Sequence, residues 1–200
     1  KTVTGDFNLA VGDKSGQQVQ GAQTQALGNS SRQNVTGNYN LAYGSWSGST
    51  VIGNQNQAFG DSAGINVTGN SNASFGSFAG RTVSGWYNVA VGTLAGNNVS
   101  GNENISIGFY AGKDVTASNA VSIGSNSKAN ANQAIAMGTG AQATGVSSIS
   151  IGTGNTVSGA NSGVIGDPTT VTGSGTYSVG NNNGTIAANT SGVFGNDNTI

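Results

Sequence analysis

The chain has 200 residues, of which 35 are glycine and only 6% are charged, and its net charge is −1. This composition disfavours an ordinary globular core, and the scattered charges disfavour a nucleic-acid or anionic-membrane surface. Histidine and cysteine are absent. Because they supply the commonest general base, the thiol nucleophile and the usual zinc ligands, we expect no enzyme activity, no catalytic residues, no metal and no other cofactor.

One glycine recurs at a nearly fixed interval along the whole chain. The step is 16 residues up to Gly124, then 14 up to Gly180, and 15 to Gly195. The first ten of these glycines, which we predict to lie in turns, are Gly12, Gly28, Gly44, Gly60, Gly76, Gly92, Gly108, Gly124, Gly138 and Gly152. A short fixed period indicates a stack of similar coils.

Each repeat contains two short alternations of apolar residues with small or polar ones. The first ends at the recurring glycine, as in Asn88-Val89-Ala90-Val91-Gly92, and the second centres on a valine that recurs every 16 residues from Val3 to Val115. A spacing of two predicts β-strands, and the flanking glycines and asparagines predict tight turns. We therefore predict an all-β solenoid of about 13 coils of 14–16 residues, with two short strands per coil and parallel stacking.

An apolar residue precedes each recurring glycine, and we predict that it points into the coil. The predicted structural core is therefore Val11, Leu27, Phe59, Phe75, Val91, Ile107, Ile123, Met137, Ile151 and Ile165. The residue before it is small, as in Ala90 and Ser106, and is predicted to face a neighbouring subunit or a ligand.

An asparagine column lies four residues before the glycines. Its members are Asn8, Asn40, Asn56, Asn72, Asn88 and Asn104. Amides stacked in register can hydrogen-bond along the stack, so we predict a ladder rather than a ligand site.

The coils are predicted to form a single unit over residues 1–200. Coils of 16 residues dominate 1–124 and coils of 14 dominate 125–200, because an Ala-Gly pair such as Ala95-Gly96 is lost after Gly124. This difference is predicted to affect only one edge of the rod. Gly163, Gly192 and Pro168 interrupt the pattern, so a looser C-terminal end is expected.

A single rod of this kind is expected to associate. The few side chains that each coil buries offset the conformational entropy of an ordered coil only in part. A second apolar face buried between chains would supply the rest, so we predict an oligomer.

The segment Asn119-Ala120-Val121-Ser122-Ile123-Gly124-Ser125-Asn126-Ser127 resembles the head repeat of the YadA-like trimeric autotransporter adhesins, Asn-Ser-Val-Ala-Ile-Gly-x-x-Ser. The resemblance extends over essentially the whole chain, although eight of its coils follow the longer 16-residue step. It implies a left-handed parallel β-roll and a homotrimer on the outer membrane of a Gram-negative bacterium. It also implies a head fragment, joined to the membrane only through a C-terminal anchor outside this sequence.

The function that this resemblance implies is adhesion. Such heads attach bacteria to extracellular-matrix proteins of the collagen, fibronectin or laminin type, or to host cell-surface receptors. Many weak sites on three chains would gain avidity through their high effective concentration.

Two groups of large side chains in predicted turns are candidate ligand-binding residues. The first is Trp46, Phe78, Leu94 and Tyr110, two residues after the recurring glycine, and the second is Tyr39, Trp86 and Tyr87, together with Phe7. Exposed apolar strips mark docking sites, and aromatic rings stack on sugars. Packing within the coil or against a neighbouring subunit is the alternative for both groups.

Two other functions fit a solenoid. An ice-binding surface needs unbroken threonine columns, but Gln20, Ile52 and Ser84 interrupt the column of Thr4, Thr36 and Thr68. A glycan-binding solenoid such as a phage tail fibre is the other alternative, and a glycan-cleaving one would need paired carboxylates.

Overall fold

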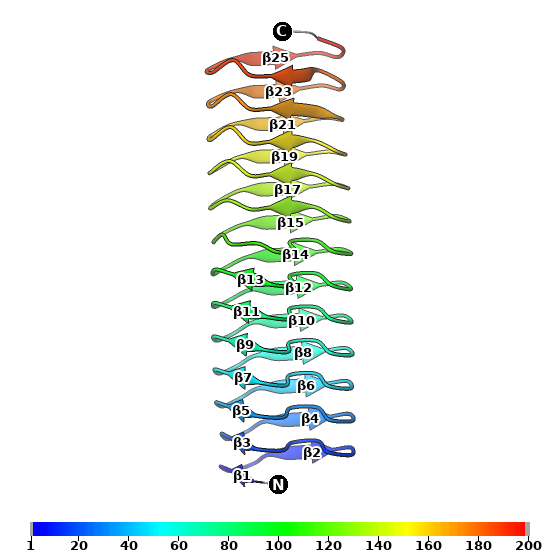
Figure 1. The fold of residues 1–200 in the computed structure, drawn as a ribbon, viewed down its shortest axis with the longest axis vertical. Helices are drawn as coiled ribbons and strands as arrows, with labels where there is room; N and C mark the ends of the chain where they lie inside the picture. The colour runs from blue at the N-terminus through cyan, green and yellow to red at the C-terminus, as the bar shows by residue number, and fades with distance from the viewer. Residues whose placement is uncertain (1, 199–200) are drawn as a thin grey trace.

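The chain winds into a parallel β-solenoid of about 12 turns, with its two ends at opposite ends of the rod (Figure 1). The structure is a computed structural model that describes residues 2–198. All 25 strands within that range pair in parallel, and no helix occurs there, so none is long and apolar enough to cross a membrane. The prediction of an all-β solenoid with parallel strands is confirmed.

The strands form three sheets that run along the rod. The long sheet contains β2 (Leu9–Val11), β4 (Gln25–Leu27), β6 (Leu41–Tyr43), β8 (Gln57–Phe59), β10 (Ala73–Phe75), β12 (Val89–Val91), β14 (Ile105–Ile107), β15 (Val121–Ile123), β17 (Ile135–Met137), β19 (Ile149–Ile151), β21 (Gly163–Ile165), β23 (Tyr177–Val179) and β25 (Gly192–Phe194). The first short sheet contains β1 (Val3–Thr4), β3 (Val19–Gln20), β5 (Val35–Thr36), β7 (Val51–Ile52), β9 (Val67–Thr68), β11 (Val83–Ser84) and β13 (Val99–Ser100). The second short sheet contains β16 (Lys128–Ala129), β18 (Gln142–Ala143), β20 (Thr156–Val157), β22 (Thr169–Val171) and β24 (Gly184–Ile186).

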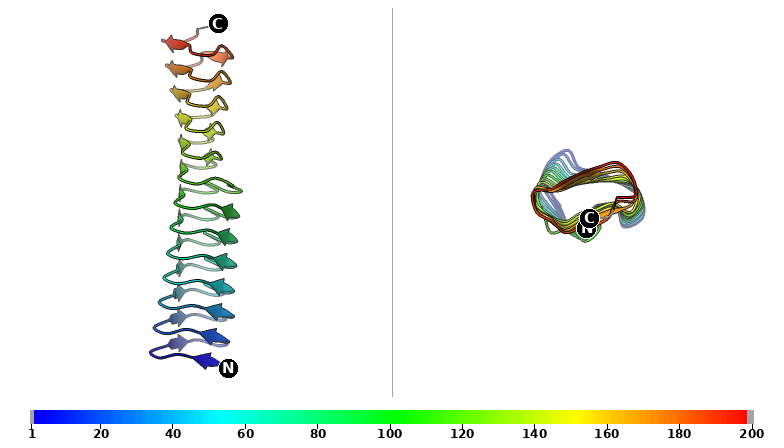
Figure 2. Two further views of the ribbon diagram at one scale, coloured as in Figure 1. Left: turned by 90° about the vertical axis from the view of Figure 1, so that its left-hand side faces the viewer. Right: turned by 90° about the horizontal axis from the view of Figure 1, so that it is seen from above.

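The register between strands follows the period of the sequence. Val89 pairs with Ile105 at a step of 16, and Val121 pairs with Ile135 at a step of 14. The long sheet continues across this change, whereas the first short sheet ends at β13 and the second begins at β16. The coils overlay along the rod axis as one flattened ring (Figure 2). The lost Ala-Gly pair lay in the wide turn that follows each strand of the long sheet in the earlier coils.

The interior of the coils differs from the prediction. None of the ten predicted core residues from Val11 to Ile165 is buried; Val11 is 54% exposed and Ile107 is 39% exposed. The small residues between them are buried instead, namely Ala26, Ala42, Ala58, Ser74, Ala90, Ser106, Ser122, Ala136 and Ser150. The prediction of the apolar column as core, and of the small column as an outer face, is wrong for the single chain.

The reason is the thinness of the coil. The valines of the facing strands, Val19 to Val99 in steps of 16, are buried and already fill much of the interior. Only alanine or serine fits opposite them; even the inward-facing Ala90 would lie 2.8 Å from a Cβ placed on Gly96. The larger members of each alternation must therefore point outward.

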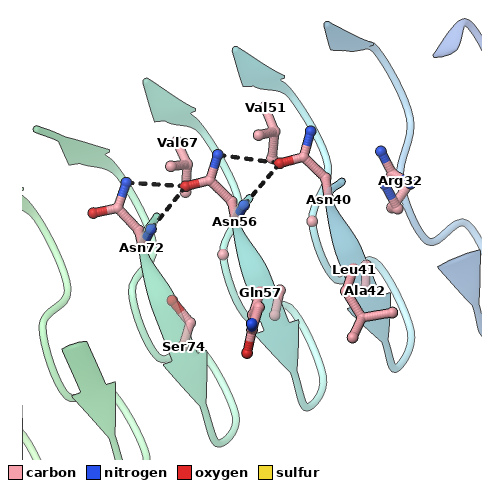
Figure 3. Close-up of a pocket in the computed structure, with 13 residues that line it drawn as sticks. Arg32, Asn40, Leu41, Ala42, Val51, Asn56, Gln57, Val67, Asn72 and Ser74 are labelled. Carbon is pink, nitrogen blue, oxygen red and sulfur yellow. Dashed lines mark hydrogen bonds between the residues drawn. The ribbon is translucent and has the colours of Figure 1, made fainter. Parts of the chain in front are cut away.

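The predicted asparagine ladder is confirmed from Asn40 to Asn104 (Figure 3), whereas Asn8 is separated from it by Thr24, which donates to Oδ1 of Asn8. The side chain of Asn56 donates from Nδ2 to Oδ1 of Asn40 at 3.2 Å and to the carbonyl oxygen of Gly69 at 2.8 Å. The same pattern repeats at Asn72, Asn88 and Asn104. The ladder satisfies amides that the coil buries, and it ties each coil to its neighbours.

The ten recurring glycines all lie in turns at positive φ, between 119° and 133°. The lack of space also excludes a side chain at these positions, because a Cβ at Gly92 would lie 2.8 Å from the carbonyl oxygen of Gly108 in the next coil. Any side chain in this column would therefore separate stacked coils.

The C-terminal coils keep the strand pairing through β25. Their interior contains larger side chains than the earlier coils, in a separate cluster of Val157, Val164, Val171, Ile186 and Val193. Gly163 and Gly192 stand in an outward row of the long sheet rather than in the core. The interruptions noted in the sequence therefore do not break the stack.

Candidate binding surfaces

The outer side of the long sheet carries two parallel rows of mainly apolar residues, which we call the apolar face. One row is Leu9, Gln25, Leu41, Gln57, Ala73, Val89, Ile105, Val121, Ile135, Ile149, Gly163, Tyr177 and Gly192. The other is Val11, Leu27, Tyr43, Phe59, Phe75, Val91, Ile107, Ile123, Met137, Ile151, Ile165, Val179 and Phe194. Neither row contains a charged residue.

Aromatic rings stack on one another within this face. The ring centroids of Tyr43 and Phe59 lie 5.1 Å apart, and those of Phe59 and Phe75 lie 5.0 Å apart, with nearly parallel planes. The ring of Phe75 nevertheless remains 37% exposed. The stack thus stabilises neighbouring strands while presenting an apolar surface outward.

The outer sides of the two short sheets are polar by contrast. The outward residues of the first are Thr4, Gln20, Thr36, Ile52, Thr68, Ser84 and Ser100, and those of the second are Lys128, Gln142, Thr156, Thr170 and Thr185. Ile52 is the one large apolar member among them. Because Gln20 and Ile52 interrupt the threonines, this surface lacks the regular array of an ice-binding face.

The predicted strip of Trp46, Phe78, Leu94 and Tyr110 lies in one column on the wide turn, with Ser62 between Trp46 and Phe78, and we call it the wide-edge ridge. All four residues have φ between 57° and 59°. Their backbone N–H groups bond to the preceding coil, as from Leu94 to the carbonyl of Ser77 at 3.0 Å. Arg81 lies 5.9 Å from the centroid of the Phe78 ring, and the Lys113 ammonium lies 5.2 Å from that of Tyr110. The ridge is therefore apolar with flanking cations.

The second predicted group lies on the opposite, short turn, and we call it the short-edge column. Phe7, Tyr39 and Tyr87 occupy the same position in different coils at φ of 59–60°, and Trp86 is the exposed residue before Tyr87. Two shallow grooves of about 400 Å³ flank Tyr39. Phe7, Gln23, Gln25 and Leu41 line one, and Gln55, Gln57, Ser71 and Ala73 line the other.

The structure thus separates the seven predicted ligand-binding residues into two strips on opposite edges of the rod. The apolar face was not predicted as a surface, because one of its rows was assigned to the core. Arg32, which stands where neighbouring coils have Gly16 and Gly48, was not predicted as a functional residue either. Alignment of the repeats would have revealed Arg32, because the same position is glycine in the coils on either side.

The seven carboxylates all lie at the surface of the coils. Asp6, Asp13, Asp61, Glu103, Asp114, Asp167 and Asp197 are all exposed. Within residues 2–198, no group of three or more histidine, cysteine, aspartate or glutamate side chains is placed to hold a metal ion. The surfaces described above are therefore the features from which a function can be argued.

The sequence matches no protein-family model and no curated protein. The resemblance of its repeats to the YadA-like head repeat accordingly remains an interpretation of the motif.

Proposed function

We propose that the chain is the head of a trimeric bacterial surface adhesin, with the apolar face as the contact between chains and the wide-edge ridge as the ligand-binding surface. The left-handed winding of the coils, the outer-membrane location and a C-terminal anchor outside this sequence are parts of the same proposal. The proposals of three chains and of an outer-membrane location rest on the resemblance of the repeats to the YadA-like head repeat. The physical argument for association comes from the apolar face.

The apolar face has the properties of a contact surface. Its 13 strands, at a spacing of about 4.8 Å, make it about 60 Å long. Contiguous exposed apolar surface of this extent is rare on soluble monomers and marks interaction sites. Copies related by rotation about an axis parallel to the rod would keep equivalent coils level, so apolar rows would meet apolar rows over the whole length.

The observation that carries a binding function is the backbone conformation of the aromatic residues. Left-handed φ is unfavourable for bulky side chains, at a cost of about 1–2 kcal/mol per residue. Trp46 adopts φ of 58° and is 50% exposed, so its side chain gains little from burial in its own chain. The turn imposes a positive φ on every residue of this column, Ser30 and Ser62 included, so the choice of a bulky, exposed side chain at Trp46 is what points to a function at the surface. Matrix proteins or cell-surface receptors are the ligands that we propose for the wide-edge ridge.

A triple variant tests this ridge. Trp46→Ser, Phe78→Ser and Leu94→Ser copy Ser62, which already occupies the same column at φ of 54°. We expect binding to immobilised collagen, fibronectin or laminin to fall at least about tenfold, because avidity multiplies the loss of each weak contact. Circular dichroism should remain unchanged. Biolayer interferometry on the assembled protein measures the effect.

Tyr87→Ser, on the opposite edge, is the matched control and should bind these proteins as the parent does. If the triple variant keeps full affinity, the wide-edge ridge is not the binding surface. If the parent binds none of the three matrix proteins or intact host cells, the adhesin proposal itself fails.

Glycan binding is the second candidate function, and the short-edge column favours it. Tyr39 stands between two grooves lined by the amides of Gln23 and Gln55, which, unlike Gln25 and Gln57, lie outside the apolar face. Aromatic rings flanked by amides are suited to stacking on a pyranose ring while hydrogen-bonding its hydroxyl groups. Such a surface belongs to a phage tail fibre as readily as to an adhesin.

Tyr39→Gln tests this candidate with little change to the fold, because Gln23 and Gln55 already occupy the same column in the neighbouring coils. A glycan array should show binding by the parent, and the variant should lose it by about tenfold, which corresponds to about 1.4 kcal/mol. Phe109→Gln, on the far edge, should leave the array unchanged. An array without any signal for the parent would reject glycan binding.

A further inference from the structure

Arg32 is the one charged side chain within residues 2–198 that the coil encloses. It is 1% exposed, and its Nη2 atom has no hydrogen-bond partner among the described residues. The seven carboxylates of the chain are all exposed on turns, so none shares the interior with this guanidinium. Burial lowers the pKa of Arg32 to about 10, which leaves the side chain a cation at neutral pH.

An arginine at this position is expected to lower the stability of the coil. The equivalent residues in neighbouring coils are Gly16, Gly48 and Gly64, at φ of 58–62°, and Arg32 itself has φ of 50°. A Cβ at Gly16 or Gly48 would lie 2.6 Å or 2.8 Å from the Cβ of the inward alanine of its coil. The coil therefore accepts a side chain in a position suited to glycine, and with it a buried charge.

Arg32 lines a cavity of about 70 Å³ at the N-terminal end of the rod. Its other lining residues include Val3, Leu9, Ala10, Val19 and Ala26, with Asn8 and Thr24, and of these Val3, Leu9 and Ala10 are exposed. Asn8 donates to the carbonyls of Gly5 and Gly21, and its Oδ1 accepts from Thr24. The polar groups other than Arg32 are thus engaged with one another. Towards the C-terminus Arg32 abuts the ladder at Asn40, where the remaining space is about 10 Å³ (Figure 3).

We propose that Arg32 and the cavity that it lines form a binding site for a small monovalent inorganic anion such as chloride. A single positive charge requires one negative charge, and the protein interior supplies none. A volume of about 70 Å³ accommodates such an ion with a water molecule, given about 30 Å³ for a water in the liquid. An anion as large as gluconate, with its six-carbon chain, exceeds this volume. The ion would accept from Nη2 and would offset the buried charge between the second and third coils.

The first test compares salts at equal ionic strength on the assembled protein. We expect the melting temperature to be about 3 °C higher in sodium chloride than in sodium gluconate, because only the smaller anion enters the site. Arg32→Gly restores the residue of the neighbouring coils, so it should fold, lose the difference between the salts and melt above the parent in gluconate. Arg81→Gly, which removes an exposed arginine, should keep the difference. Equal melting of the parent in both salts, or a difference that persists in Arg32→Gly, overturns the proposal.

The second test locates the ion and does not depend on any variant. Crystals of the parent grown in sodium bromide should give an anomalous peak within about 3.5 Å of the Arg32 guanidinium. Water alone at this position, with bromide absent or bound only at the surface, would show that solvent rather than an anion satisfies Nη2.

Discussion

Ile107→Lys is expected to convert the assembled protein into single chains of 19.6 kDa. Ile107 lies in β14, near the middle of the apolar face, and is 39% exposed in the single chain. If the chains are related by rotation about an axis parallel to the rod, the introduced lysines of all copies would lie at the same level of the desolvated contact. Like charges without partners are costly in such an environment. Sedimentation velocity at micromolar concentration measures the change.

Ile52→Lys is the matched control for this prediction. It makes the same substitution at a residue that is 57% exposed, but on the polar side of the first short sheet. Its mass should equal that of the parent. An Ile107→Lys variant with the mass of the parent would remove the apolar face from the contact between chains.

Asn72→Leu is expected to cost about 3 kcal/mol of unfolding free energy, because it breaks the buried ladder in its middle. Asn72 donates to Oδ1 of Asn56 at 3.0 Å and to the carbonyl of Gly85 at 2.9 Å, and it accepts from Asn88. Leucine keeps the branch at Cγ, but it is larger than asparagine and leaves these buried groups without a partner. For a chain of 200 residues, this loss corresponds to a fall in melting temperature of about 6–12 °C. Differential scanning calorimetry measures it.

Gln20→Leu provides the comparison, since it also exchanges an amide for leucine but at an exposed position of β3. Its stability should stay within about 0.5 kcal/mol of the parent. If both variants melt together, the ladder contributes little, and the coils are held by their backbone bonds alone.

Much of the fold could be predicted from the sequence because a period repeated many times averages out local ambiguity. The two alternations gave the strands, the glycine column gave the turns, and the asparagine column gave the ladder. Each of these depends on local geometry: an apolar spacing of two, a backbone at positive φ, or identical amides one coil apart.

The inside and outside of the long sheet could not be assigned in the same way. An alternation such as Val89-Ala90-Val91 identifies two faces, but it does not say which of them meets the core. Hydrophobicity favoured the valines, and that choice was wrong. The deciding factor was the space between two closely apposed sheets, where Val83 and Val99 leave room only for a small residue such as Ala90.

The site residues were only partly predictable for a related reason. Large side chains in turns marked Trp46 and Tyr39 as unusual, and the structure places both at exposed positive-φ positions. Their separation onto opposite edges required the path of the coil. Arg32 was overlooked because an arginine in a turn normally points to solvent, whereas this turn directs its side chain inward.

The measurement that tests the central claim most directly is the molar mass of the unmodified protein in solution, by light scattering over a range of dilutions. The apolar face predicts an assembly, and the resemblance of the repeats predicts three chains of 19.6 kDa that stay together at micromolar concentration. A folded single chain, with the apolar face open to water, would contradict both the contact surface and the adhesin head that we build on it.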